Sequence, residues 1–217
     1  MMIENLYVLT FKGSENGESG ESVGSEYDLS DACKTCGTRA KLKGHLRVKK
    51  VKTKNLFSET YDGDHLISDD LYHAIILHGA KIDHLLHVID YKTIQELPFY
   101  HLKSNYYFPK MRKDSVGLIT EDQCPTCMQN GFYDDVPLGG VGFIRIYKYN
   151  YKDIKDILPM SDVFCTWEHI GASNLTAHGN KVVRYARPRF IIKEKIKKIL
   201  EDLKVKKVVF EKIEIFE

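Results

Sequence analysis

Two short stretches, Cys33-Lys34-Thr35-Cys36-Gly37 and Cys124-Pro125-Thr126-Cys127, decide how this chain is held together. In each stretch two residues separate the cysteines, so both thiolates of a pair can point into one tight turn, here called a knuckle. Two knuckles brought together present four sulfur atoms in a tetrahedron, which suits zinc. Such a site leaves no open position for water, so we expect a structural zinc ion with four ligands: Cys33, Cys36, Cys124 and Cys127.

The two knuckles differ in sequence. Gly37 follows the first pair, at a position where such a turn often needs a positive φ, whereas Met128 holds that position after the second pair. The long gap between the pairs, from Gly37 to Gln123, suggests a subdomain inserted between the two arms of a zinc ribbon. A redox-active dithiol and a site too degenerate to hold metal remain as alternatives.

Composition sets the class of protein. The chain has 217 residues, 43% of them hydrophobic and 29% charged, which is ordinary for a soluble globular protein large enough to form a core without disulfides. Its N-terminus lacks the pattern of a signal peptide, and no stretch has the length and apolarity of a membrane span. We therefore expect a cytoplasmic protein with no membrane partner, in which paired cysteines bind metal.

Charge is balanced overall but clustered locally. The net charge is +2, from 32 basic and 30 acidic residues, so nucleic acid is an unlikely partner on this count. The segment Glu15–Glu26 is rich in Gly, Ser and Glu and predicts a mobile acidic loop. The segment Arg39–Lys54 carries many basic residues and no acid, which predicts either an extended hairpin with one wet face or a phosphate-facing strand.

Two segments share one order of predicted elements. The segment Leu66–Tyr91 reads as strand, helix and strand, with Ser68 as a good N-cap, and Ile191–Ile215 reads the same way. We therefore suggest an internal duplication in which each half carries one knuckle followed by strand–helix–strand. The expected fold class is α+β, with mixed or antiparallel sheets, short helices and a zinc-ribbon-like clip. The expected regions are 1–135, with both knuckles and the inserted unit, and 136–217, which ends in strand–helix–strand.

The remaining candidate chemistry is weak. Cys165 lies among apolar neighbours and reads as a buried inert thiol, although Cys165, His169 and Glu168 could form the centre of an enzyme. No phosphate-binding loop, nucleophile elbow or zinc-protease motif is present in the sequence. We therefore expect no catalytic residues and no enzyme.

The spaced cysteine pairs and the C-terminal block resemble the bacterial double-CXXCG-motif family. That block comprises Ser161-Asp162-Val163-Phe164, Trp167-Glu168-His169 and Arg187-Pro188-Arg189-Phe190-Ile191-Ile192, followed by a helix and a strand. The chain departs from the pattern at Met128, where glycine is usual, and at Lys193, where related families have a serine helix cap. The missing cap would cost about 1 kcal/mol.

The resemblance implies an immunity protein of a toxin–immunity system, which binds and neutralises one cognate protein toxin. Charged patches often speed such encounters, and Glu15–Glu26 and Arg39–Lys54 are the two candidates. The rival reading is a nucleic-acid-binding or transcription-associated zinc-ribbon protein, which would need one continuous basic face formed by Arg39–Lys54 with the C-terminal lysines Lys193, Lys197, Lys204 and Lys207.

Overall fold

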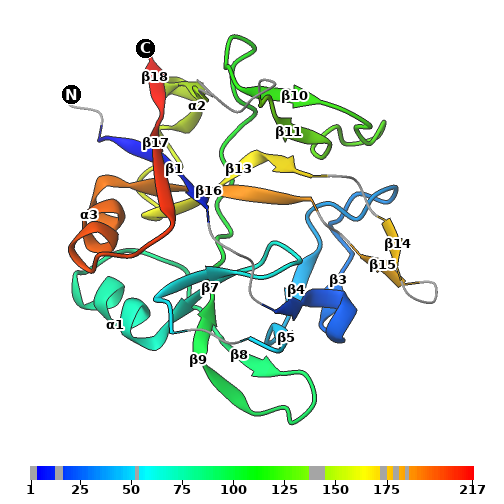
Figure 1. Ribbon diagram of the computed structural model, residues 1–217. Coiled ribbons are helices and arrows are strands. Elements are labelled where there is room, and N and C mark those ends of the chain that lie inside the picture. The colour runs from blue at the N-terminus through cyan, green and yellow to red at the C-terminus, as the bar shows by residue number, and fades with distance from the viewer. Residues whose placement is uncertain are drawn as a thin grey trace.

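Two six-stranded sheets dominate the computed structural model of the chain (Figure 1). The structure describes residues 4–12, 17–51, 54–136, 145–171, 175–177, 181–183 and 186–217. Sheet one has the strand order β10 (Leu118–Thr120), β11 (Phe132–Asp134), β13 (Val163–Ile170), β16 (Arg187–Lys193), β1 (Leu6–Phe11) and β17 (Val208–Lys212). Sheet two has the order β2 (Glu18–Ser19), β5 (Arg47–Lys49), β8 (His87–Asp90), β9 (Glu96–His101), β7 (His65–Ser68) and β6 (Phe57–Glu59).

Smaller elements complete the described part of the chain. Two-stranded pairs are formed by β3 (Glu26–Asp28) with β4 (Lys41–Lys43), β12 (Lys148–Asn150) with β18 (Glu214–Phe216), and β14 (Leu175–Ala177) with β15 (Lys181–Val183). The helices are α1 (Asp69–Leu77), α2 (Tyr151–Ile154), α3 (Glu194–Asp202) and the 3-10 turn η1 (Gly20–Val23). Most strand pairs of the described residues are antiparallel, but β11 with β13, β5 with β8 and β12 with β18 are parallel. The structure thus agrees with the expected α+β class of mixed sheets and short helices.

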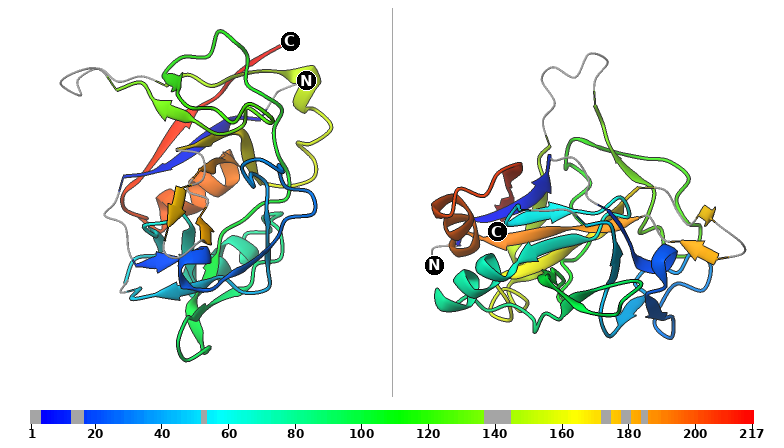
Figure 2. Two further views of the ribbon diagram at one scale, coloured as in Figure 1. Left: turned by 90° about the vertical axis from the view of Figure 1, so that its right-hand side faces the viewer. Right: turned by 60° about the horizontal axis from the view of Figure 1, so that its bottom comes forward.

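One large core is shared by both sheets and by the two longer helices. Leu71 and Ile75 of α1 meet Ile196, Ile199 and Leu200 of α3 in this core, together with residues from both sheets. The two helices contact each other and lie side by side, which Figures 1 and 2 show from three directions. The helices therefore close one side of the space between the sheets.

The outer face of each sheet has a core of its own. Alternation along β16 explains the division, because Ile192 faces the shared core while its neighbour Ile191 packs with Leu6 and Phe164 in a second core. A third core on sheet two includes Val48 and Val88. The chain therefore buries both faces of its central strands, which accounts for their nearly continuous apolar sequence.

The two predicted strand–helix–strand units have the same topology. In the first unit β7, α1 and β8 follow one another, and β9 lies between the two strands, antiparallel to both. In the second unit β16, α3 and β17 follow one another, and β1 takes the intervening place, again antiparallel to both. A further antiparallel strand, β6 or β13, borders each unit. The repeated topology supports the suggested duplication, although the middle strand comes from opposite ends of the two units.

The predicted mobile acidic loop is wrong for Glu18–Glu26, where the structure has ordered elements, while residues 13–16 lie outside the described residues. Strand β2 pairs with β5, and β3 pairs with β4, so the acidic segment lies directly against the basic stretch. Lys49 contacts Glu18 at 2.8 Å, and Lys43 stands opposite Glu26 in the register. The two candidate charged patches therefore lie against each other, and the charges of Lys49 and Glu18 are paired.

The sheets cross the predicted division between regions 1–135 and 136–217. Sheet one takes β1, β10 and β11 from the first region, and β13, β16 and β17 from the second. The reason is non-local pairing, since β1 at one end of the chain pairs with β16 and β17 at the other. Among the described residues, no helix is both long enough and apolar enough to cross a lipid bilayer.

Candidate metal centre and an adjoining cavity

Each cysteine pair lies in the loop of a two-stranded hairpin. Cys33 and Cys36 lie between β3 and β4, and Cys124 and Cys127 lie between β10 and β11. The second hairpin belongs to sheet one through β11, whereas the first forms a separate pair beside sheet two. The long gap between the knuckles is thus filled mainly by sheet two and α1, the inserted unit expected from the sequence.

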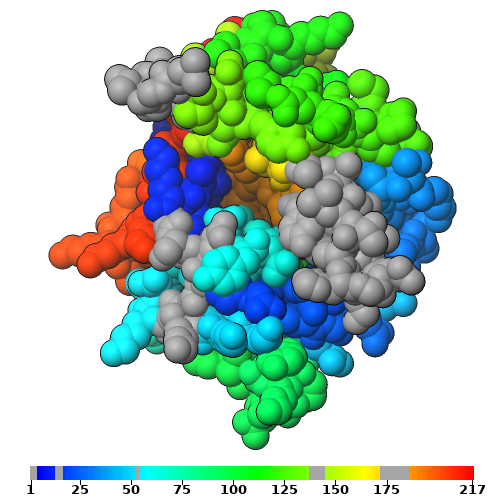
Figure 3. All heavy atoms as spheres, turned by 45° about the vertical axis from the view of Figure 1, so that its right-hand side comes forward, coloured from blue at the N-terminus to red at the C-terminus, as the bar shows by residue number. Residues whose placement is uncertain are grey.

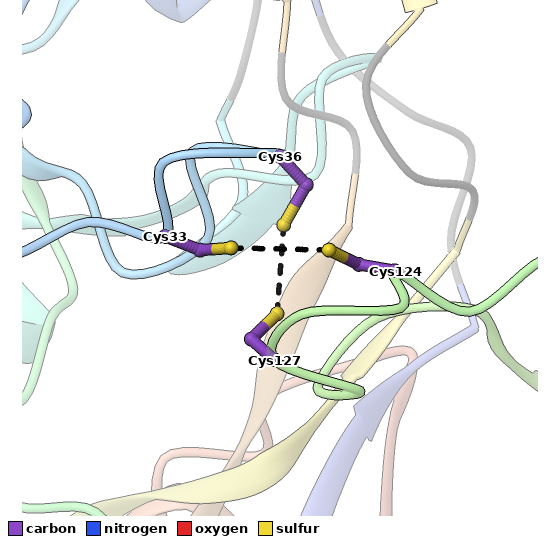
Figure 4. A group of neighbouring side chains, drawn as sticks. All are labelled: Cys33, Cys36, Cys124 and Cys127. Atoms are coloured by element: carbon purple, nitrogen blue, oxygen red, sulfur yellow. Dashed lines mark hydrogen bonds between the residues drawn. The ribbon is translucent and has the colours of Figure 1, made fainter.

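The four sulfur atoms point toward one another from two opposed loops (Figure 4). The Sγ atoms of Cys33 and Cys124 are 3.8 Å apart, those of Cys36 and Cys127 are 3.5 Å apart, and all four lie within 4.8 Å of one another. A tetrahedron with Zn–S bonds of about 2.3 Å has edges of about 3.8 Å, whereas a disulfide needs about 2.05 Å. The spacing therefore fits one shared metal ion, and all four thiols are free of disulfides.

The two knuckles have the same backbone turn. The N–H of Gly37 donates to the carbonyl of Cys33 at 2.7 Å, and the N–H of Met128 donates to that of Cys124 at 2.9 Å. Gly37 has φ +69°, and Met128 has φ +54° in spite of its side chain. The second knuckle therefore forms the expected turn without glycine. Met128 adopts the left-handed conformation, although the Cβ atom makes this conformation less favourable than it is for glycine.

Polar contacts hold the second knuckle in place. The side-chain carbonyl of Asn130 accepts from the N–H of Cys124 at 2.8 Å, and the Gln123 amide donates to the carbonyls of Met128 and Asn130. Gly131 has φ +74°, and a Cβ there would lie 2.2 Å from the carbonyl oxygen of Glu121. The second knuckle therefore requires glycine at position 131. This is three residues after Met128, the position that corresponds to Gly37 of the first knuckle.

Hydroxyl groups connect and tune the site. The Thr35 and Thr126 hydroxyls, at the same position in the two knuckles, lie 2.7 Å apart and connect them across the cluster. Thr38 places its hydroxyl 3.0 Å from the Sγ of Cys36. Burial by itself would raise the pKa of Cys124, but the N–H groups of Cys127 and Thr126 stabilise its thiolate and bring that pKa to about 6. Burial raises the pKa of the neighbouring Cys127 thiol to about 12, so Cys124 ionises before Cys127.

This arrangement brings together all four cysteines expected from the sequence, and it can hold a metal ion. Cys36 and Cys124 are buried, and Cys33 and Cys127 are half-buried. Four protein ligands would fill a tetrahedral ion completely, so the chemistry of such a site is to tie chain segments together, not to activate water. The ion would join the hairpin beside sheet two to the hairpin that forms the edge of sheet one.

A cavity of about 760 Å³ lies next to the first knuckle, at the end of the space between the sheets that the helices leave open. Figure 3 shows a hollow on one face of the molecule, with orange and yellow residues from the C-terminal part of the chain in its depth. The described residues that line it come from the first knuckle, the β6–β7 turn, the segment after β9, and strands β13 and β16. Sequence reasoning missed this cavity, because its walls come from five separate parts of the chain.

Cys165 and His169 both line this cavity, as an enzyme built on them would require. Burial raises the pKa of the Cys165 thiol to about 12, and burial lowers the pKa of His169 to about 4. The Cys165 thiol donates to the carbonyl of Ser104, and the Nδ1 of His169 bonds to the carbonyl of Trp167. At neutral pH the two groups are thus a thiol and a neutral imidazole, not the thiolate–imidazolium pair of a cysteine nucleophile.

Glu168 does not join them. Its carboxylate accepts from the N–H of Met111 at 2.9 Å, and it is absent from the described lining of the cavity. Burial raises its pKa to about 7, and its second oxygen, Oε2, is buried without a hydrogen-bond partner among the described residues. The three residues proposed for an enzyme are therefore not brought into one site.

Comparison of the sequence with protein-family models finds no match, and comparison with curated proteins finds none either. The resemblance to the double-CXXCG-motif family thus rests on the short motifs quoted above. What the structure itself contributes is a cluster of four cysteines that could hold a metal ion.

Proposed function

We propose that this protein is a non-catalytic binding protein, clipped by a structural zinc ion, and that it acts as a cytoplasmic immunity protein against one bacterial toxin. The observation that carries the proposal is the convergence of Cys33, Cys36, Cys124 and Cys127 within 4.8 Å of one another. The inference that the partner is a toxin rests only on the family resemblance. The position of each cysteine pair in the loop of a two-stranded hairpin supports a zinc-ribbon-like clip, with sheet two inserted between its arms.

Zinc is the metal that the ligand set favours. Tetrahedral sites of four thiolates select zinc or iron, and in a reducing compartment zinc gives a closed, redox-inert clip. Elemental analysis of the purified protein should find one equivalent of zinc, and chelation should lower its thermal stability. Less than about half an equivalent, with no loss of stability on chelation, would refute the clip. One equivalent of iron, with a visible thiolate-to-iron absorption band, would show that the site holds iron and not zinc.

Lysines paired with acidic residues support a protein partner over nucleic acid. Lys41 is paired with Asp31 at 2.6 Å, and Lys197 is paired with Glu201 at 3.0 Å. Lys193 is buried and paired with Asp162. The continuous basic face required by the rival reading is thus interrupted by acids among the described residues. Binding of DNA or RNA that weakens steeply with salt would restore that rival.

Co-expression tests the immunity role. The toxin encoded beside this gene should arrest growth alone, and the wild-type protein should restore growth and co-purify with the toxin. A variant with Cys36→Ser and Cys124→Ser should lose protection if the clip supports the binding surface, whereas Cys165→Ala should retain it. Failure of the wild-type protein both to restore growth and to form a complex would refute the proposal.

A further inference from the structure

We propose that the cavity beside the first knuckle is a binding site for a small organic anion, a ring-bearing phosphate or carboxylate, with Arg39 as its principal anchor. The volume of about 760 Å³ lies within the range of small-molecule sites. The proposal concerns a ligand of this chain and stands independently of toxin binding.

The charge of the cavity wall favours an anion. The basic residues of the described lining are Arg39, Lys41, Lys103 and Arg187, and the acidic residues are Asp31 and Asp64. Each acid already has a cation, since Asp31 lies 2.6 Å from the ammonium of Lys41 and Asp64 lies 3.4 Å from the guanidinium of Arg187. Arg39 and Lys103 have no carboxylate partner among the described residues, so they carry the charge that a ligand would meet.

Asp64 is already committed to the protein. Burial alone would raise its pKa, but Arg187 and His101 hold that pKa well below its usual range. The hydroxyl of Ser19 also donates to Asp64 at 2.7 Å. This carboxylate therefore stays ionised, and its charge is already balanced by groups of the protein. It would attract a cationic ligand only weakly.

The conformation and contacts of Arg39 suit the binding of an anion. Its guanidinium lies 5.2 Å from the centre of the Tyr107 ring, and Tyr107 stacks on His169, with ring planes 5° apart. Its backbone has φ +69°, a conformation unusual for a residue with a side chain. Because a guanidinium presents several N–H donors in one plane, Arg39 can bind two oxygens of a phosphate or carboxylate while it keeps its contact with the Tyr107 ring.

Two histidines in the wall, His65 and His169, add no positive charge at neutral pH. Burial lowers the pKa of His65 to about 4, and burial, aided by the positive charges of Arg39 and Arg187, lowers the pKa of His169 to about 4. The residues that carry both guanidinium groups line the cavity. The neighbouring rings of Tyr27, Tyr107 and Phe190 provide an apolar surface for the ring of the ligand.

Three matched probes test the site by isothermal titration of the full chain: phenyl phosphate, benzoate and the neutral benzamide. At least one anion should bind with a dissociation constant below 1 mM, at least tenfold tighter than benzamide. The preferred anion identifies the class as phosphate or carboxylate. Failure of both anions to bind, or equal binding of benzamide, would overturn the proposal.

Two variants on the same wall separate Arg39 from general surface charge. Arg39→Gln should weaken binding of the preferred anion at least tenfold, while Lys41→Gln, whose ammonium already belongs to Asp31, should change it less than twofold. Both side chains are exposed, so both variants should unfold at close to the wild-type temperature. Equal effects of the two variants, or no effect of Arg39→Gln, would refute the anchor.

Discussion

The two halves of the suggested duplication form the same local structures through different residues. The first half comprises the first knuckle and the unit β7–α1–β8, and the second half comprises the second knuckle and the unit β16–α3–β17. Each half has a knuckle and a strand–helix–strand unit. In the first half, Gly37 provides the positive φ of the knuckle, and the Ser68 hydroxyl caps α1 by accepting from the N–H of Leu71 at 3.2 Å. In the second half, Met128 and Lys193 occupy the corresponding positions. Neither is the residue that local preference would choose.

The backbone is nevertheless nearly identical. Ser68 has φ −69° and ψ 162°, and Lys193 has φ −77° and ψ 161°. Lys193 does not cap α3, but its ammonium contacts the buried Asp162 at 3.0 Å, and Asp162 accepts from the N–H of Lys81 at 2.7 Å. The comparison teaches that a local signal can be replaced by a long-range contact that fixes the same geometry.

The largest effect should come from breaking the clip, which both halves share. Cys36→Ser in the first knuckle and Cys124→Ser in the second should each abolish metal binding and lower the free energy of unfolding by roughly 5 kcal/mol. Metal content and urea denaturation measure the two effects. Cys165→Ala, which alters a buried thiol outside the cluster, should keep one equivalent of metal. If either variant kept one equivalent of metal, the substituted cysteine would not be a ligand, and the two knuckles would not share one metal ion.

The next largest effect should come from Lys193. Lys193→Ser offers α3 the cap that α1 has, yet it should destabilise the protein by about 3 kcal/mol, because it leaves the buried Asp162 carboxylate without its nearest cation. Urea denaturation measures this change. Lys195→Ser is the control, since Lys195 is 45% exposed and 3.7 Å from the same carboxylate, and it should cost less than about 1 kcal/mol.

Ser68→Ala completes this pair of substitutions and should cost about 1 kcal/mol, the usual value of an N-cap. If Lys193→Ser instead stabilised the protein, the second half would depend on local capping as the first half does.

Buried carboxylates should give the halves different responses to pH between 6 and 8.5. The pKa of Glu168 is raised by burial to about 7, above its ordinary 4.5, so the folded state favours the proton and stability falls as pH rises through 7. The effect of Glu168→Gln on stability should therefore be more favourable at pH 8.5 than at pH 6 by about 1.4 kcal/mol, because about one pKa unit of the shift lies above pH 6. Denaturation at both pH values measures this gap. A gap that stays constant would contradict the raised pKa.

In the first half the pKa of Asp64 is held low by Arg187 and His101 against the effect of burial, so its contribution to stability is lost only as pH falls through that low value. Between pH 6 and 8.5, Asp64→Asn should therefore destabilise the protein by an amount that does not change with pH. A pH-dependent loss in this range would remove the contrast between the halves.

The smallest effect should come from exchanging the residues that follow the knuckles. Gly37→Ala places a Cβ at φ +69° and should cost about 1 kcal/mol, whereas Met128→Gly relieves strain and should be neutral or stabilising by up to about 1 kcal/mol. Thermal unfolding of the metal-loaded protein measures both. Equal destabilisation by the two changes would mean that Met128 is held by its side chain and not merely tolerated.

Sequence reasoning went furthest where the signals are local. The four cysteines were predicted as one cluster from their spacing, and α1 was predicted from Ser68 and the apolar positions that follow it. It failed for Glu18–Glu26, because a Gly- and Ser-rich composition does not reveal that β2 and β3 will pair with the basic strands β5 and β4.

The sequence by itself determined the ligands of the candidate metal centre, the α+β class and the two strand–helix–strand units, since each follows from residue spacing along a few turns or strands. Only the tertiary structure decided that β1 joins β16 and β17, that Asp162 compensates the missing cap at Lys193, and that Arg39 and Arg187 meet in one cavity. These features depend on contacts between residues far apart in the sequence, from 31 positions for Asp162 and Lys193 to well over a hundred for β1 and β16, and the order of amino acids along the chain carries no local signal of such contacts.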